Sequence, residues 1–440
     1  MKTRKIKSTA EKGITLVALV ITIVILIILA TITINVAFGE GGLIEKAQQA
    51  KNLTEEATRE EQESLNSLMS AYANIMAEEG ENGTGGTTPE EPDEPEKSEV
   101  EIAKENGETF DETTTIEDEH GNKITVPEGF KIPEDSGDTV QEGIVIEDAF
   151  SEDENVRGSQ YVWIPVGTFK KDDEDETESN EIVLGRYTFA DDANGTPTLQ
   201  QAAYTTENPE NYTTSVIIEN RYSEMSTYRE GVASASNGKN ATAYDLEAWI
   251  NSVKENGGYY IGRYEASYAS GSSTANYKAA SKVSRSYSTS SMSNDPGTLW
   301  NNIIQIDASK VAINTYKDST NGVKSDLINS YAWDTAIVYI QEAGYTNYAN
   351  RFGESINSNL TNTGTGQDEV CKINDMASNE IEWTTEYCSG TSGGDYIPGV
   401  NRGGKYSMGR MVKTSFRQYC LMTGGDPVAG FRLTLYLEQK

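Results

Sequence analysis

The chain of 440 residues carries 69 acidic against 36 basic side chains, which gives a formal net charge of −33 at neutral pH. So acidic a chain disfavours nucleic acid as a partner, because phosphate binding needs clustered lysine and arginine. The length allows two or three domains. Three cysteines, Cys371, Cys388 and Cys420, are too few for a disulfide-rich scaffold. They can be buried thiols, or one pair can form outside the cell.

The first apolar segment follows a short basic leader. Five of the first twelve residues are lysine or arginine, and residues 14–38 that follow carry no charged side chain. As a helix this segment would be about 37 Å long, enough to cross ~30 Å of hydrocarbon. The basic cluster favours a cytoplasmic N-terminus, so we expect a single-pass cell-membrane protein whose C-terminal domain is extracellular. The uncharged run is too long for an ordinary cleaved signal peptide.

The junction between the basic leader and the apolar segment resembles that of type IV prepilins. In that family the prepilin peptidase cuts after a glycine, here Gly13, and the next residue, Ile14, becomes the methylated N-terminus. The resemblance implies a leader at residues 1–13, a pilin-like hydrophobic and amphipathic helix at residues 14–78, and pilin-like subunits as partners. Ala18 stands where pilins carry a glutamate thought to pair with a neighbouring subunit. An uncleaved single-pass anchor is therefore the alternative, and fibre membership stays open.

The rest of the chain divides by composition. Residues 79–100 are rich in Gly, Thr, Pro and Glu and are expected to form an acidic disordered linker. A short β-rich segment is predicted at residues 101–159, where "GNKITVPEGFKIP" alternates apolar and polar residues around a turn. "SQYVWIPVGTF" adds strands at the start of a domain predicted over residues 160–440. Two amphipathic helices are predicted in that domain, at residues 243–258 and 330–344.

Several stretches of this last domain recur in one known family. They are "YVWIPVGTF", "GGYYIGRYEAS" (257–267), "NDMASNEIEWTTEY" (374–387), "NRGGKYS" (401–407), Arg417 and "AGFRLTL" (429–435). In this order they resemble the formylglycine-generating-enzyme, or sulfatase-modifying-factor, family, whose domain is a variant of the C-type lectin fold. The resemblance implies an α+β fold class: a long N-terminal pilin-like membrane helix plus a C-type lectin-like globular domain of the formylglycine-generating-enzyme type.

The residues that catalytic members of this family need are missing. Those members bind copper through two cysteines after an Arg-Gly-Gly motif, and thiolates are the ligands that Cu(I) prefers. The matching positions here are Met408 and Lys413. Iron-dependent relatives need several histidines, and a Ser-His-Asp triad needs one. The chain has a single histidine, His120, and it lies upstream of the domain. We therefore expect no enzyme activity and neither copper nor iron. An enzyme of the sulfatase-modifying-factor type with displaced chemistry is an alternative.

The turn before Trp383 forms a calcium site in characterised relatives of this family. Carried over by position, Asp375 and Glu382 would supply carboxylate oxygens, while Ser378 and Glu380 would supply backbone carbonyls. These are the oxygen donors that calcium prefers. The resemblance thus implies calcium as a cofactor that stiffens the fold. The alternative is a turn held by its own backbone hydrogen bonds.

Three arginines, Arg402, Arg417 and Arg432, are candidate ligand-binding residues, because the resemblance places them at the family's pocket. They can equally be partners of buried carboxylates. The loops are rich in Tyr, Ser, Asn and Gly, a composition typical of recognition surfaces. The leading prediction is a pilin-like, membrane-anchored surface protein whose non-catalytic lectin-like head recognises or adheres to an extracellular glycan or protein. A structural or minor subunit of a type IV pilus or pseudopilus is the alternative.

Overall fold

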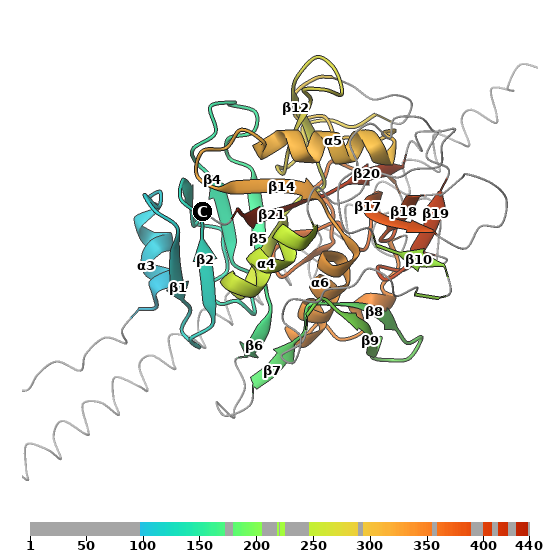
Figure 1. The fold of residues 1–440 in the computed structure, drawn as a ribbon, viewed down its shortest axis with the longest axis horizontal. Helices are drawn as coiled ribbons and strands as arrows, with labels where there is room; N and C mark the ends of the chain where they lie inside the picture. Colours follow the sequence, from blue (N-terminus) through green and yellow to red (C-terminus); the bar gives the residue numbers. More distant parts are fainter. Residues whose placement is uncertain are drawn as a thin grey trace, which may run out of the picture. The chain divides into compact units, whose positions relative to one another are not determined.

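A computed structural model describes ten ranges of the chain (Figure 1). They are residues 97–171, 179–204, 218–219, 221–224, 246–288, 294–353, 359–388, 399–406, 412–420 and 428–438. All of them belong to Glu94–Lys440, the second of the two units into which the chain divides. The predicted leader with Gly13 and Ile14, and the predicted helix at residues 14–78, lie outside the described residues.

The described part of the chain is mostly β-sheet. It contains twenty-one strands and four α-helices, and these helices are only 8 to 13 residues long. None of the helices in these ranges is long and apolar enough to cross a membrane, a task that needs about 20 residues. The predicted fold class, an α+β chain led by a long membrane helix, is therefore wrong for the part that the structure describes. The described ranges likewise do not bear out the membrane and transmembrane assignments.

The four described helices are short and differ in how much of their surface is buried. The helices are α3 (Glu99–Asn106), α4 (Leu246–Asn256), α5 (Gln305–Tyr316) and α6 (Ser330–Glu342), with a 3-10 turn at Tyr348–Asn350. Helices α4 and α6 confirm the two helices predicted from apolar periodicity. In α4 the predicted face is buried, and the indole Nε1 of Trp249 donates a hydrogen bond to Thr434 Oγ1 at 3.2 Å.

Two sheets form the framework. The larger sheet is antiparallel, in the order β14 (Val323–Leu327), β21 (Leu433–Leu437), β11 (Gly258–Gly262), β5 (Gln160–Pro165), β4 (Val145–Asp148) and β3 (Phe130–Lys131). The smaller sheet has the order β10 (Tyr222–Ser223), β17 (Ile381–Cys388), β18 (Gly399–Arg402) and β19 (Arg417–Cys420), with β20 (Ala429–Phe431) parallel to β17. Because β4 pairs with β5, the segments predicted at residues 101–159 and 160–440 share one sheet.

Five two-stranded ribbons complete the described elements. They are β1 (Thr114–Glu117) with β2 (Lys123–Val126), β6 (Gly167–Lys170) with β7 (Ser179–Ile182), β8 (Gly185–Phe189) with β9 (Pro197–Ala202), β12 (Ser267–Ser270) with β13 (Lys278–Ala280), and β15 (Glu369–Val370) with β16 (Ile373–Asn374). Strands β12 and β13 lie in a Ser-, Tyr- and Asn-rich tract in which the sequence predicted no strand. Both faces of such short strands can be buried, which removes the alternation that identifies a strand.

Helix α6 connects the two sheets. It contacts β5 of the larger sheet and β17 of the smaller one, and its residues from Ser330 to Ile340 are buried. The side chain of Asn329 caps its first turn by accepting a hydrogen bond from the Ala332 amide at 2.9 Å. A helix buried on all sides is normally apolar throughout. Its one acidic residue in this buried run, Asp334, therefore needs partners within the protein.

Candidate functional site

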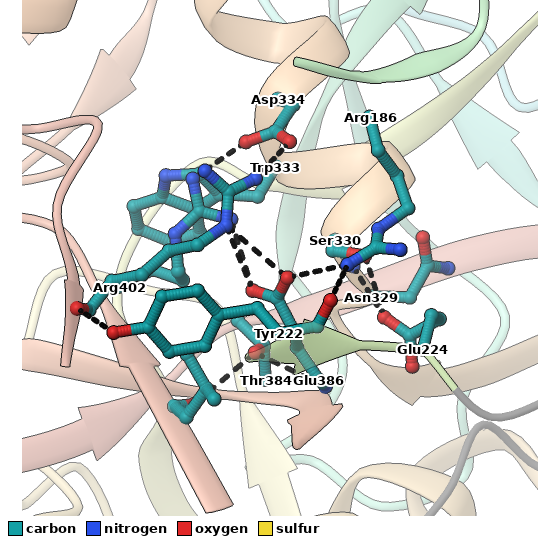
Figure 2. Close-up of polar contacts among 12 residues, drawn as sticks. Arg186, Tyr222, Glu224, Asn329, Ser330, Trp333, Asp334, Thr384, Glu386 and Arg402 are labelled. Carbon is teal, nitrogen blue, oxygen red and sulfur yellow. Dashed lines mark hydrogen bonds and ion pairs between the residues drawn. The ribbon is translucent and has the colours of Figure 1, made fainter. Parts of the chain in front are cut away.

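Three arginines and two carboxylates meet beneath the smaller sheet, and we call them the arginine cluster. Arg186 comes from β8, Arg402 from β18, Arg417 from β19, Asp334 from α6 and Glu386 from β17. All five side chains are at most 2% exposed. Figure 2 shows the Glu386 carboxylate directed at the Arg186 guanidinium on one side, with Asp334 and Arg402 on the other. Five separate elements are thus joined at one buried point.

The contacts within the arginine cluster are short and shared. Glu386 Oε1 lies 2.8 Å from Arg186 Nη2 and 3.1 Å from Arg417 Nε, and Glu386 Oε2 lies 3.5 Å from Arg402 Nη1. Asp334 Oδ1 accepts a hydrogen bond from Arg402 Nη2 at 2.5 Å, and its Oδ2 accepts one from Arg417 Nη2. Each carboxylate therefore binds at least two guanidinium groups.

The strand register explains why the arginines need these acids. Arg402 on β18 lies directly opposite Arg417 on β19, and like charges in that position repel each other. Asp334 and Glu386 each bind both arginines and so compensate the repulsion. The Arg402 guanidinium also lies 5.7 Å from the ring centre of Trp333, a distance at which cation–π attraction acts.

The electrostatics keep Glu386 ionised. Burial would raise the pKa of the Glu386 carboxyl, but Arg417, Arg186 and Arg402 outweigh burial and lower that pKa to about 2. Burial raises the pKa of the neighbouring Glu224, which accepts hydrogen bonds from the Ser330 amide at 2.9 Å and from Thr385 Oγ1 at 2.7 Å. The arginine cluster is thus a charged, hydrogen-bonded support.

An open pocket lies above this support, and we call it the strand pocket. Its volume is about 470 Å³, and its lining includes Arg221, Lys413, Phe416, Arg417 and Tyr419. Phe416 and Tyr419 are 37% and 46% exposed, and the Arg221 guanidinium lies 6.0 Å from the ring centre of Tyr419. Arg417 belongs to both the pocket lining and the arginine cluster, and its backbone carbonyl accepts a hydrogen bond from the Tyr222 hydroxyl at 3.0 Å. The pocket therefore combines exposed rings with cations above a rigid base.

The third predicted arginine, Arg432, lies in a different place. Its Nη2 is 2.6 Å from Glu382 Oε1 and its Nε is 3.1 Å from Glu382 Oε2. The backbone carbonyls of Gly262 and Asn374 accept hydrogen bonds from Nη1 and Nη2, each at 2.7 Å. The side chains of Arg432 and Glu382 are fully buried, so the pair joins β17 to β11 and β16.

The residues predicted to bind calcium surround this pair. Asp375 Oδ2 accepts hydrogen bonds from Thr363 Oγ1 and the Gly364 amide, both at 2.9 Å, and its Oδ1 has no hydrogen-bond partner. The backbone amide of Glu380 donates to Glu265 Oε1 at 2.9 Å, and the Ser378 amide donates to the Asp375 carbonyl at 3.3 Å.

One of the predicted calcium ligands is engaged by an arginine in this arrangement. Both oxygens of the Glu382 carboxylate are bonded to Arg432, so a predicted ligand is already neutralised. Within the described ranges, no group of three or more His, Cys, Asp or Glu side chains is placed to hold a metal ion. The Ser378–Asp375 backbone bond is of the kind expected for a self-supported turn. Calcium binding stays a prediction.

Of the two positions that match the copper ligands of the catalytic relatives, the structure describes only one. Met408 lies outside the described residues. Lys413 Nζ lies 2.7 Å from Asp191 Oδ1 and 3.0 Å from Asn350 Oδ1. Cys371 and Cys388 are buried free thiols.

Sequence reasoning found Arg402 and Arg417 but missed their acidic partners. Asp334 had a usable signal, since it is a single acid within the apolar helix "SYAWDTAIVYI". Glu386 follows Glu382 in a strand that is otherwise buried, which also indicates a paired carboxylate. Arg186 and the exposed rings Phe416 and Tyr419 gave no comparable signal, because only the fold brings them to this place.

Comparison with known proteins identifies no family. No protein-family model matches the chain, and no curated protein matches it. Among solved structures, the chain is similar to PvdO from Pseudomonas aeruginosa at 10% identity and a TM-score of 0.31, over 66% of this chain and 97% of that one. It is also similar to Treponema denticola variable protein 1 at 13% identity and a TM-score of 0.24, over 64% of this chain and 96% of that one. At these TM-scores neither likeness carries an argument about this chain.

Proposed function

We propose that this domain is a non-catalytic binding module that recognises an extracellular glycan or protein at the strand pocket. One observation carries the proposal: the exposed rings of Phe416 and Tyr419 line the same pocket as Arg417, whose guanidinium is held by Asp334 and Glu386. Large rings that stay exposed on a folded surface mark binding sites when they gather in a concave place.

The rigid base favours recognition. A side chain that is already ordered loses little entropy when a ligand binds. Arg417 is fixed by four polar contacts, to Asp334, to both oxygens of Glu386 and to the Tyr187 carbonyl. Tyrosine adds a large contact area with few rotatable bonds, and Gln418 and Ser415 add hydrogen-bonding groups to the same lining.

The arginine cluster supports a structural role and gives no reason to propose catalysis. Its carboxylates and guanidiniums compensate one another, and all are almost completely buried. A general acid or base must reach the proton that it transfers. Glu386 is held ionised by three arginines and is fully buried, so it is poorly suited to that task.

The experiment is a glycan array and a cell-binding assay with the purified full-length protein and three variants. Tyr419→Ala and Phe416→Ala remove rings from the strand pocket, and we expect each to lower the binding signal at least several-fold. Tyr287→Ala is the matched control, because Tyr287 is 45% exposed and does not line this pocket. Binding that survives both pocket substitutions in folded protein contradicts the proposal.

A further inference from the structure

A second hollow lies directly after helix α6. Its volume is about 250 Å³, and it is lined by Tyr345, Thr346, Asn347, Tyr348, Asn350 and Arg351; we call it the turn hollow. Its backbone is held in place, since the Asn347 amide donates a hydrogen bond to the Asn194 carbonyl at 3.0 Å. The Ala349 amide donates to Gln341 Oε1 at 2.9 Å. The hollow is therefore preformed by the fold.

The strand pocket and the turn hollow are neighbours. Lys413 lines the strand pocket, and its Nζ is 3.0 Å from Oδ1 of Asn350, which lines the turn hollow. Asn350 is itself fixed, because its Nδ2 donates to the Ala190 carbonyl at 2.8 Å. One lysine–asparagine contact thus forms the boundary between the two concave regions, and a ligand longer than one of them meets the other.

Exposed aromatic rings gather in these two places. In the described part of the chain four aromatic side chains are largely exposed, namely Tyr287, Tyr345, Phe416 and Tyr419. Tyr345 lines the turn hollow, while Phe416 and Tyr419 line the strand pocket. Three of the four exposed rings therefore lie at these two neighbouring concave regions.

The rest of the lining indicates what kind of ligand fits. Among the described residues that line either region, none has an aliphatic side chain; besides the rings they carry hydroxyl, amide, guanidinium, ammonium or carboxylate groups. A peptide is normally anchored by aliphatic or aromatic side chains that enter apolar pockets. Flat rings beside amide and guanidinium donors instead match the face and the hydroxyl groups of a sugar.

The charge of the lining is opposite to that of the chain. Among the described residues, Arg221, Lys413 and Arg417 line the strand pocket with Glu219 as the only acid, and Arg351 lines the turn hollow. Three of these cations are also bonded to acids: Arg417 to Asp334 and Glu386 in the arginine cluster, Lys413 to Asp191, which is 88% exposed, and Arg351 to the buried Asp368 at 3.4 Å. Local cations on a chain of net charge −33 attract an anionic ligand to this surface.

From these observations we infer that the strand pocket and the turn hollow together bind one acidic oligosaccharide. One sugar ring lies against Tyr419 and Phe416, a later ring lies against Tyr345, and carboxylate or sulfate groups face Arg221, Lys413 and Arg351. The inference rests on the proposed function, since it names the ligand class and extends the same site.

The test is calorimetric titration of the full-length protein with four probes: a chondroitin sulfate disaccharide, its hexasaccharide, a galacturonate hexasaccharide and neutral maltohexaose. We expect at least one acidic hexasaccharide to bind about tenfold more tightly than the disaccharide and than maltohexaose. Raising the salt from 50 to 300 mM should weaken that binding, because screening reduces attraction between exposed charges.

Three variants separate the two regions. Tyr419→Ala should weaken every acidic probe, whereas Tyr345→Ala should weaken the hexasaccharide about tenfold and leave the disaccharide unchanged. Tyr287→Ala, the exposed tyrosine outside both regions, should change neither. Thermal unfolding of each variant establishes that the fold is intact.

The outcomes distinguish this inference from the proposed function. If Tyr419→Ala weakens the hexasaccharide but Tyr345→Ala does not, the extended site is overturned and recognition at the strand pocket stands. If no acidic probe binds while the array detects a neutral glycan or a protein that depends on Tyr419, the ligand class is overturned and the proposed function stands. Binding that is indifferent to both tyrosines overturns both.

Discussion

Arg417 Nε lies 3.1 Å from Glu386 Oε1, and both side chains are almost completely buried. This contact joins β19, which carries the exposed Tyr419, to β17 in the middle of the smaller sheet. The same carboxylate also binds Arg186 and Arg402. The surface proposed to bind ligand is therefore supported by a buried charge network rather than by an apolar layer.

Replacing Glu386 should destabilise the domain strongly. Glu386→Gln removes one of two carboxylates bonded to three buried guanidinium groups. Breaking a buried ion pair from one side costs about 3–5 kcal/mol, because the remaining charge is left without compensation. Urea unfolding of wild type and variant measures the difference.

A surface pair provides the control for that measurement. Lys324 Nζ is 3.3 Å from Glu438 Oε2, and the Glu438 side chain is 60% exposed. Glu438→Gln should change the free energy of unfolding by at most about 1 kcal/mol. Equal effects of the two substitutions would show that the arginine cluster does not hold the smaller sheet together.

Glu386 should also make the domain sensitive to acid. Its pKa lies at about 2 in the folded protein against an ordinary value of 4.5. A lowered carboxyl pKa stabilises the fold above the ordinary value, and that stability is lost as the pH falls from about 4.5 towards 2. The loss amounts to roughly 3 kcal/mol. Unfolding free energies measured in this pH range should fall steeply for wild type and less steeply for Glu386→Gln; parallel curves would contradict the assignment.

Asp368, in contrast, should make the fold less stable as the pH rises. Burial, with a smaller contribution from Asp375, raises its pKa from 3.8 to about 6 despite the opposing charge of Arg351. The folded protein then holds a proton that the unfolded chain releases, so stability falls as the pH rises from about 4 through 6. Asp368→Asn should remove this pH dependence. Comparison of the variant with wild type therefore separates the effect of Asp368 from the general repulsion among the other acids.

The difference between the two unfolding curves tests this point. Wild type should lose stability relative to Asp368→Asn between pH 4 and pH 6, and the difference should become constant above pH 7. A difference that does not change with pH would mean that Asp368 titrates at its ordinary value. Together, Glu386 and Asp368 favour greatest stability of this part of the fold at about pH 4–5.

The Arg-Gly-Gly sequence at residues 402–404 should tolerate no side chain at its last position. A Cβ atom on Gly404 would lie 1.9 Å from the carbonyl oxygen of Ala377, a backbone atom that cannot move without shifting the turn that contains Asp375. Gly404→Ala should therefore destabilise the domain by several kcal/mol, roughly 2–5. Chemical denaturation measures the effect.

Gly107 is the matched glycine for this substitution. It has φ +61° at the end of α3, and an added Cβ would meet nothing within 4 Å. Gly107→Ala should cost only the left-handed strain of an ordinary residue, about 1–2 kcal/mol. If Gly404→Ala costs no more than this, the close approach of Gly404 to the Ala377 carbonyl is not required for stability.

Local sequence was sufficient for the elements whose pattern is strong. The apolar spacing in "AYDLEAWINSVKENGG" predicted α4, and "SYAWDTAIVYIQEAG" predicted α6. The alternation around Pro127 predicted β2 and β3. Helix α5 was missed, because no side chain caps its first turn and most of its residues are buried, so the one-sided apolar stripe is absent. The predicted fold class failed for a different reason: the described elements are mostly β-strands, and none of the described helices is long and apolar enough to cross a membrane.

The sequence by itself determined the charge of this protein and its two amphipathic helices, and it offered Arg402, Arg417 and Arg432 as candidates for a ligand or for buried acidic partners. Only the tertiary structure decided that Arg402 and Arg417 share Asp334 and Glu386, whereas Arg432 pairs with Glu382 elsewhere. Pairing between strands that are distant in the sequence sets the distances between these side chains. No local sequence pattern predicts that pairing. The same holds for the strand pocket and the turn hollow, whose lining residues Lys413 and Asn350 meet although 63 positions of sequence separate them.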